Sequence, residues 1–244
     1  MFQRPRRQVL NALQPSQHKV EVRNEGDFLR GITTAQERYA RQDKTIPPGF
    51  LFEIVEPLVI TNTIIIPVDT PGVTVWSPAR LSITATKDMD KLFEIRAENC
   101  TFSNLSVNDT NAKDIGMMFH LADTARFATI ENITAHGQRF VGGSATPPQN
   151  TVVSNCLFVL KSSGSVLEPA VLAGSIGKVV DNVVPRRIDC TGRETAITGN
   201  AVPGITVYGG GVSGACSIAN NMLSGSTIDT TGAAFGCVIS GNVP

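Results

Sequence analysis

In the last fifty residues the hydrophobic positions form short alternating runs, and an asparagine follows each run. A β-branched residue stands three positions before the asparagine in three copies: Ile197 before Asn200, Ile218 before Asn221 and Ile239 before Asn242. These asparagines are spaced 21 and 21 residues apart. Alternating runs of this kind suit a strand and are too short for a helix. A repeat near this length predicts that the chain is built from stacked structural units.

Weaker copies of the same unit occur upstream. They end at Asn104, Asn132, Asn155 and Asn182, and the gaps along the whole series are 28, 23, 27, 18, 21 and 21 residues. Such irregular spacing favours coils of fixed cross-section with loops of variable length over a leucine-rich or propeller array. An asparagine at each corner tolerates a left-handed backbone and can hydrogen-bond to the asparagine of the next coil. The pattern therefore predicts an all-β fold, a parallel β-helix.

A helical pattern precedes these coils. From Asp27, a plausible N-cap, one face of the predicted helix carries the apolar side chains of Phe28, Leu29, Ile32, Ala35 and Tyr39. The first coil of a β-helix has an open apolar end, and we expect this helix to cover it. The predicted division is an arm over residues 1–26, a cap helix over 27–45 and a β-helix over 46–244.

Between the helix and the repeat the sequence predicts further strands. They fall in Phe50–Val59, Ile60–Pro67, Val73–Trp76, Leu81–Thr84, Leu92–Ile95, Met118–Leu121 and Val152–Leu160. The continuous apolar run Ile64–Ile66 is typical of a strand that is buried on both faces. Two longer loops, 138–150 and 161–169, interrupt the coils, and projecting loops are common places for a binding site.

Several of these segments resemble a known superfamily. The helix, "IPPG" at 46–49, Phe52-Glu53-Ile54, "PLVI" at 57–60, "NTIII" at 62–66 and the later "ITGN" and "ISGN" units are similar to right-handed β-helix proteins of the pectate-lyase-like superfamily. The resemblance covers about residues 27–244 and implies a right-handed, single-stranded parallel β-helix with a cap helix and an extended N-terminal arm. That superfamily includes lyases, hydrolases, adhesins and bacteriophage tail spikes, so the fold alone does not give the function.

Charge is unevenly distributed although the net charge is zero. Residues 1–24 contain five basic residues and one acidic residue, a net charge of +4, whereas Asp229 is the only charged residue from Thr195 onward. An exposed surface is normally rich in charge, which indicates that sister subunits or another protein cover this end. The alternative is that this end is an uncharged surface of Gly, Ser and Thr residues that stays exposed to solvent.

The N-terminal arm contains candidate anchors for a partner, and we name Phe2, Arg4, Arg6, Arg7 and Leu10 as partner-binding residues. A frayed terminus is the alternative interpretation. Three arginines without interleaved aromatic residues or a folded basic face do not indicate binding to nucleic acid.

Cysteine usage and the hydropathy pattern bear on where the chain folds. The five cysteines follow no metal-binding spacing, and most stand in or beside apolar runs as small core residues, which favours folding in a reducing cytoplasm. Neither a signal peptide nor an apolar run long enough to span a membrane is present, so we expect no membrane insertion.

Candidate chemistry is sparse. Asp109, Asp114 and Asp123 are spread through one coil, which argues against a clustered calcium site, and we predict neither metal nor cofactor. A glycosidase needs two carboxylates across a groove, and the best candidates are Glu168, Asp189 and Glu194, beside Arg186, Arg187 and Arg193. A solvated loop with local ion pairs is the alternative for this patch. His120 and His136 could approach each other across adjacent coils, but neither has a Ser or Cys partner at a recognisable spacing.

These features together resemble a phage or prophage virion protein that is not an enzyme. We expect a spike, fibre or decoration subunit that folds in the host cytoplasm and joins the virion, where its N-terminal arm contacts other virion proteins. The resemblance implies a homotrimer, and contact with host glycan is a further expectation. The alternatives are a polysaccharide depolymerase acting on capsule or lipopolysaccharide, and a secreted adhesin.

Overall fold

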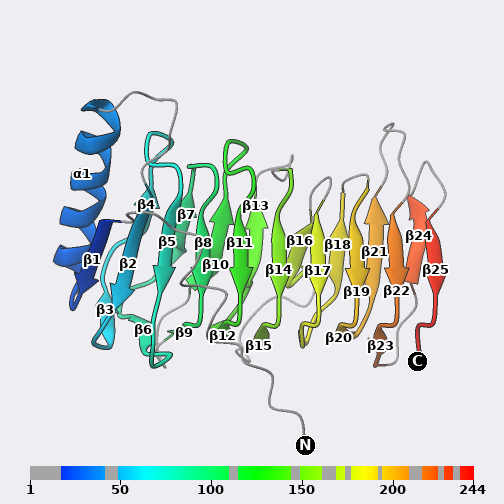
Figure 1. Ribbon diagram of the computed structural model, residues 1–244. Helices are drawn as coiled ribbons and strands as arrows, with labels where there is room; N and C mark the ends of the chain where they lie inside the picture. Colours follow the sequence, from blue (N-terminus) through cyan, green and yellow to red (C-terminus); the bar gives the residue numbers. More distant parts are fainter. Residues whose placement is uncertain are drawn as a thin grey trace, which may run out of the picture.

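The chain forms a parallel β-solenoid with one helix at its first coil (Figure 1). The structure is a computed structural model that describes residues 18–41, 49–109, 115–143, 149–160, 169–173, 177–191, 194–208, 216–224, 228–232 and 237–244. Every described strand pair is parallel and joins strands of successive coils. The predicted parallel β-helix is therefore confirmed.

In the described part of the chain, three sheets run along the solenoid, and the strands counted below are those of the described residues. Sheet A has ten strands: β1 (His18–Val22), β2 (Phe50–Ile54), β5 (Val73–Trp76), β8 (Thr101–Ser103), β11 (Thr129–Glu131), β14 (Val152–Ser154), β17 (Lys178–Val180), β19 (Ala196–Thr198), β22 (Ser217–Ala219) and β25 (Val238–Ser240). Sheet C has eight strands: β4 (Ile64–Ile66), β7 (Met89–Ile95), β10 (Ile115–Leu121), β13 (Val141–Gly143), β16 (Val171–Ala173), β18 (Ile188–Cys190), β21 (Ile205–Tyr208) and β24 (Ile228–Gly232). Sheet B has five strands: β3 (Leu58–Ile60), β6 (Ser82–Ala85), β9 (Ser106–Asp109), β12 (Thr134–Gly137) and β15 (Leu157–Leu160). Isolated bridges at Val183 continue it to the pair β20 (Ala201–Val202) and β23 (Met222–Leu223).

Side chains alternate between the core and the outer surface along each strand, as the twofold period of a strand requires. In β4 this alternation buries Ile64 and Ile66 completely and leaves Ile65 38% exposed. The prediction that the run of isoleucines is buried on both faces is therefore wrong. In a solenoid only the inner face of a sheet meets the core, so a continuous apolar run still presents every second side chain to the outside.

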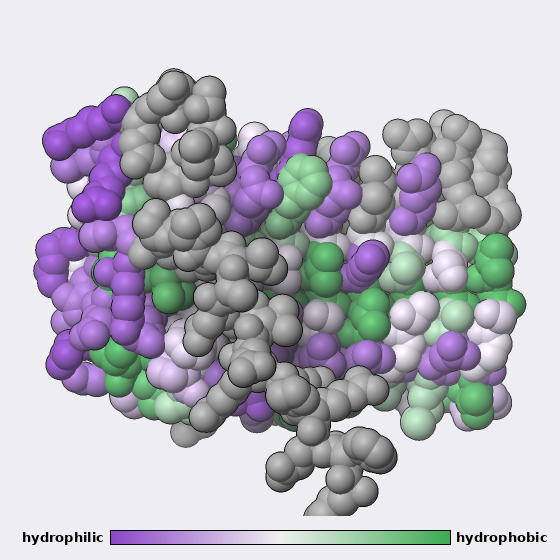
Figure 2. Space-filling model, viewed as in Figure 1, coloured by the Kyte–Doolittle hydropathy of each residue, from purple (hydrophilic) through white to green (hydrophobic). Residues whose placement is uncertain are grey.

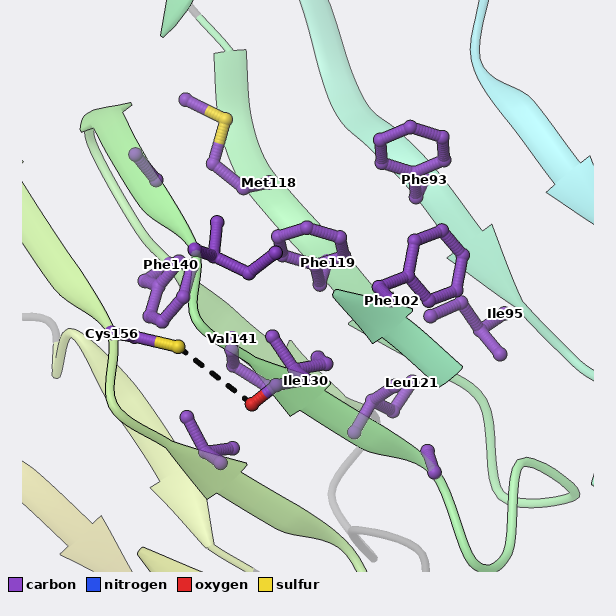
Figure 3. Close-up of a cluster of buried hydrophobic side chains, with 14 of the residues drawn as sticks. Phe93, Ile95, Phe102, Met118, Phe119, Leu121, Ile130, Phe140, Val141 and Cys156 are labelled. Carbon is purple, nitrogen blue, oxygen red and sulfur yellow. Dashed lines mark hydrogen bonds between the residues drawn. The ribbon is translucent and has the colours of Figure 1, made fainter. Parts of the chain in front are cut away.

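Phenylalanine rings form a continuous stack along the core. Phe28 of the helix stacks on Phe52, with ring centroids 4.9 Å apart, and also meets Phe93 at 6.3 Å. From Phe93 the stack continues along the solenoid through Phe102, Phe119 and Phe140 (Figure 3). It ends at Phe158, and neighbouring ring centroids from Phe93 onward are between 5.1 and 5.8 Å apart. The stack of phenylalanine rings therefore joins the cap helix and the middle coils of the solenoid in one hydrophobic core.

The helix α1 (Glu25–Arg41) covers the first coil, packing against β1, β2 and β3 (Figure 1). It begins two residues earlier than predicted, because the Asn24 side chain accepts the backbone N–H of Asp27 at 3.0 Å and is the N-cap. Gly31 lets the helix approach closely, since a Cβ there would lie 2.4 Å from the Phe52 ring. Leu29, predicted on the covered face, is exposed.

The first strand lies inside the predicted arm. β1 pairs with β2 over its full length, and Val20 and Val22 alternate with Lys19 and Glu21. Lys19 also forms an ion pair with Glu53 of β2. The boundary predicted at residue 26 is therefore wrong, because residues 18–22 belong to the solenoid and Glu25 already belongs to the helix. The predicted anchors Phe2, Arg4, Arg6, Arg7 and Leu10 lie outside the described residues.

The asparagine series occupies two different corner positions. Asn104, Asn132 and Asn155 have positive φ angles of 54°, 55° and 52°, and this left-handed position passes to Asp181, Gly199, Asn220 and Gly241 in later coils. Asn182, Asn200 and Asn221 stand one residue further on and are completely buried. Each of them donates from Nδ2 to Oδ1 of the next asparagine, over 3.0, 3.0 and 2.9 Å, and the last acceptor is Asn242. At Asn104 and Asn132 one residue meets both predictions, because Asn132 Nδ2 donates to Asn104 Oδ1 at 2.9 Å. In the later coils the left-handed corner and the hydrogen-bonded ladder fall on adjacent residues.

Glu25 ties the cap helix to the loop between β3 and β4. Its carboxylate accepts hydrogen bonds from the backbone N–H and the side chain of both Thr61 and Asn62, between 2.6 and 3.2 Å. Partial burial opposes ionisation, but these four hydrogen bonds outweigh it and lower the pKa of Glu25.

We expect Glu25→Gln to lower the thermal midpoint at pH 7, by the equivalent of about 1 kcal/mol or less because solvent screens the site. A depressed pKa means that the carboxylate stabilises the fold above its ordinary value of 4.5, and that this stability is lost as pH falls through the folded-state pKa. The difference between wild type and variant should therefore shrink between pH 6 and pH 3 in melts followed by circular dichroism. A difference that is constant over this range would contradict the assignment.

Candidate functional site

One row of outward positions runs along sheet C from coil to coil. Strand register places these positions side by side in the order Ile65, Glu94, His120, Gly142, Leu172, Asp189, Thr206 and Asp229. Neighbouring strands of a sheet are about 4.8 Å apart, so side chains of consecutive coils can act on one ligand. We call this series the sheet C row.

Glu94 of the sheet C row lies in a cluster of charges. Glu94 accepts hydrogen bonds from Lys91 Nζ at 3.3 Å and from Arg96 Nε at 2.8 Å. Partial burial opposes ionisation of Glu94, but the hydrogen bonds from Arg96 and Lys91 and the charges of both outweigh it, so its pKa is lowered. The result is a fixed carboxylate between two cations on the outer surface.

His120 lies beside Glu94 in the next coil, in direct register with it. Burial, together with the positive charges of Lys91, Arg139 and Arg96, lowers the pKa of His120 against the opposing effect of Glu94. The imidazole is therefore neutral at pH 7, with one nitrogen donating and the other accepting. Within the described structure its buried Nδ1 has no hydrogen-bond partner. A neutral, unsatisfied imidazole among charged groups is suited to holding a polar ligand.

A hollow adjoins this cluster at the beginning of β7 and β10. It has a volume of about 510 Å³ and is lined by Asp88, Met89, Asp90, Gly116 and Gln138. A Cβ at Gly116 would lie 2.7 Å from the carbonyl oxygen of Asp90, so glycine is needed for the two coils to meet there. Carboxylate and amide side chains line this concavity, and the charged residues Lys91, Glu94 and Arg96 follow Asp90 along β7.

The predicted catalytic residues are placed as follows. Asp189 lies on the sheet C row and is buried, and its two carboxylate oxygens accept from Arg187 Nε at 2.7 Å and Nη2 at 3.1 Å. The Asp189 hydrogen bond is the main cause that raises the pKa of Arg187. Glu194 is exposed, has a φ of 56° and precedes β19 of sheet A. Glu168 lies outside the described residues.

The buried Arg186 beside this ion pair also has an unsatisfied atom. Its Nη2 has no hydrogen-bond partner in the described part of the chain, although the side chain is 7% exposed. The bidentate pair of Arg187 and Asp189 is the second charged section of the sheet C row.

The two histidines do not approach each other. His120 belongs to β10 of sheet C, whereas His136 belongs to β12 of sheet B and pairs with Asn108 and Val159. The prediction that the two histidines approach each other across adjacent coils is therefore wrong, because they lie on different sheets and so on different faces of the solenoid. Among the described residues no group of three His, Cys, Asp or Glu side chains gathers to hold a metal ion. Within the same residues, no helix has the length and apolar character needed to span a lipid bilayer.

Sequence reasoning missed Glu94 and His120 as a pair. Both stand one residue after a buried phenylalanine, Phe93 and Phe119, and this shared position in Phe-Glu-Ile and Phe-His-Leu was the available signal. Aligning the two phenylalanines, 26 residues apart, would have brought the two polar side chains into register.

Comparisons with known proteins identify the fold. No family model matches the chain, and no curated protein is similar to it. Among solved structures, the Dettilon tailspike protein matches with a TM-score of 0.53 and 12% sequence identity, over 89% of this chain and 42% of that protein. The ORF18 protein of Geobacillus virus E2 matches with a TM-score of 0.39 and 9% identity, over 92% of this chain and 60% of that protein. The chain thus spans less than half the length of the tailspike, and the likeness to it shows that both contain a parallel β-helix.

Proposed function

We propose that this chain is a structural component of a bacteriophage or prophage virion, of the spike, fibre or decoration type. The observation that carries the proposal is the likeness of 89% of the chain to part of a tailspike. The sequence pattern leads to the same conclusion independently, through its basic N-terminal segment and its nearly uncharged last coils.

In this proposal the chain folds in the host cytoplasm and assembles as a homotrimer. Residues preceding β1, with Phe2, Arg4, Arg6, Arg7 and Leu10, bind other virion proteins. No nucleic acid, cofactor or membrane insertion is part of the role.

Particles purified from the strain that encodes the chain test the proposal. Mass spectrometry of gradient-purified virions should detect the chain in a fixed ratio to the major capsid protein. An antibody against it should label the particle surface in electron micrographs. Particles that lack the chain at every purification step would overturn the proposal.

Contact with host glycan is assigned to the sheet C row and the hollow beside it. Glycans present hydroxyl groups, and often carboxylates, which pair with the amide of Gln138, the cations Lys91 and Arg96, and a neutral imidazole. The neutral imidazole of His120, half-buried on this face, would exchange a hydrogen bond with a ligand hydroxyl.

We expect His120→Ala to weaken binding of capsular polysaccharide or lipopolysaccharide from the phage's bacterial host about tenfold, the effect of one lost hydrogen bond of roughly 1.4 kcal/mol. The matched control is His136→Ala on sheet B, which should bind like wild type. Biolayer interferometry on immobilised polysaccharide measures both, and equal affinities of the two variants would contradict the assignment. Affinity should also stay constant between pH 7 and pH 8, because the lowered pKa keeps His120 neutral there.

A depolymerase is the second candidate, and the position of Asp189 on the same face is the observation that favours it. We place it second because both Asp189 oxygens are held by Arg187, as in a structural ion pair, while a general acid must be free to carry a proton. The polysaccharide used for binding decides between the two when it is also assayed for released reducing ends. Release that is abolished by Asp189→Asn or Glu194→Gln would establish the depolymerase; unchanged polysaccharide supports the binding role.

A further inference from the structure

The outer face of sheet B carries an unbroken row of apolar side chains in the later coils. Register places Leu157, Val183, Ala201, Met222 and Val243 side by side, one per coil. Val159 lies next to this row and completes what we call the apolar stripe. Apart from Ala201, these side chains are between 38% and 64% exposed.

The same row is polar in the earlier coils. Ser82, Ser106 and Thr134 occupy the positions that continue the row upstream of Leu157. The inward neighbours do not change in this way, since Ile83, Val107, Ala135 and Phe158 are all buried apolar residues. The change from polar to apolar at Leu157 is therefore specific to the outer face, and the stability of the core does not require it.

The surroundings of the stripe carry few charges. From Thr195 onward the only charged residue is Asp229, which belongs to β24 of sheet C. Figure 2 shows strongly hydrophilic colours around α1 and β1 and mostly pale or hydrophobic colours over β19, β22 and β25. A contiguous exposed apolar surface marks an interaction site, and the last coils of the stripe, from Ala201 to Val243, can be desolvated without burying an unpaired charge.

We infer that the apolar stripe is the surface through which copies of this chain associate. The stripe is a ridge whose side chains repeat once per coil, about every 4.8 Å. A surface with the same repeat matches it best, and another copy of this solenoid has that repeat. In a closed assembly whose axis runs parallel to the solenoid, equivalent coils lie at the same height, so each side chain of the stripe meets its equivalents. The inference rests on the homo-oligomer of the proposed function and specifies its contact surface.

The double variant Val183→Lys/Met222→Lys tests the inference in the full chain. Both side chains point outward, so the core is untouched, while association would bury two unpaired charges in every copy. Light scattering coupled to size exclusion should give an oligomer for wild type and a monomer for the variant, with at least a hundredfold weaker association. The matched control is Ser82→Lys/Ser106→Lys, two polar positions of the same row, which should keep the wild-type mass.

The possible outcomes separate the inference from the proposal beneath it. If the wild type is oligomeric and the Val183→Lys/Met222→Lys variant is equally oligomeric, the stripe is not the contact surface, although the homo-oligomer itself is supported. A monomeric wild type overturns both the stripe and the homo-oligomer. If the lysine variant loses its circular dichroism spectrum, Val183→Thr/Met222→Gln replaces it, and an unchanged association constant there also overturns the stripe.

Discussion

Replacing Asn200 with alanine should destabilise the solenoid by roughly 2–4 kcal/mol, since each buried group left without a partner costs about 1–3 kcal/mol. The Asn200 amide donates to Val179 O, Thr198 O and Asn221 Oδ1 at 2.9, 3.1 and 3.0 Å. Its Oδ1 accepts both the backbone N–H and Nδ2 of Asn182 at 3.0 Å. Alanine leaves the buried backbone donor of Asn182 without an acceptor. The measurement is the urea midpoint followed by circular dichroism.

Two companion variants separate the ladder from a general effect of losing an asparagine. Asn155→Gly changes an exposed asparagine with a φ of 52°, a backbone that glycine adopts freely, and should lie within about 0.5 kcal/mol of wild type. Asn200→Asp keeps the shape of the side chain but puts a carboxylate oxygen in the place of Nδ2. This oxygen then faces the three oxygen atoms that accept hydrogen bonds from Nδ2 in the wild type. The variant should be strongly destabilised at pH 7 and recover below about pH 4, where a protonated carboxyl can donate. An Asn200→Ala midpoint equal to that of Asn155→Gly would contradict the ladder.

The asparagine series shows what sequence could and could not predict. Equal spacing in the last coils was enough to predict the stacked units, because in-register coils place equal residues side by side. The shift between Asn155 and Asn182 was not visible, because it depends on strand register: Val153 pairs with Val179, 26 residues on, while the asparagines are 27 apart. One extra residue moves the asparagine from the left-handed corner into the buried ladder.

The ends of elements were missed for a related reason. The alternation of His18–Val22 is too short to stand out in a polar segment, and only its pairing with Phe50–Ile54 makes it a strand. Leu29 was predicted on the covered helix face because it stands three residues before Ile32, whereas the close contact at Gly31 and Phe52 places that face nearer to Phe28 and Ile32.

The candidate site was harder to predict than the fold. Its members, Glu94, His120 and the lining of the hollow, come from different coils and share no local motif. Sequence reasoning looked for paired carboxylates and found Asp189, which does lie on this face but is held by Arg187. A site made by register across coils becomes visible only once the loop lengths between strands are known.

Phe119→Ala should cost about 3–5 kcal/mol, the range for truncating a fully buried phenylalanine. Its ring is completely buried and meets Phe93, Phe102 and Phe140 at centroid distances of 5.5, 5.3 and 5.8 Å (Figure 3). The neighbouring rings belong to separate coils whose backbones are fixed by sheet hydrogen bonds, so the core cannot collapse into the space. The cavity cost therefore adds to the lost transfer free energy.

Phe119→Leu, which refills most of that volume, should recover more than half of the loss in thermal midpoint. The matched control is Phe127→Asn, at an exposed phenylalanine with a φ of 59°. Asparagine tolerates a left-handed backbone better than phenylalanine does, so this variant should be as stable as wild type or slightly more stable. Equal midpoints for Phe119→Ala and Phe127→Asn would mean that the aromatic stack does not hold the cap and the middle coils together. A large loss confined to Phe119→Ala would identify the stack as the element that joins them.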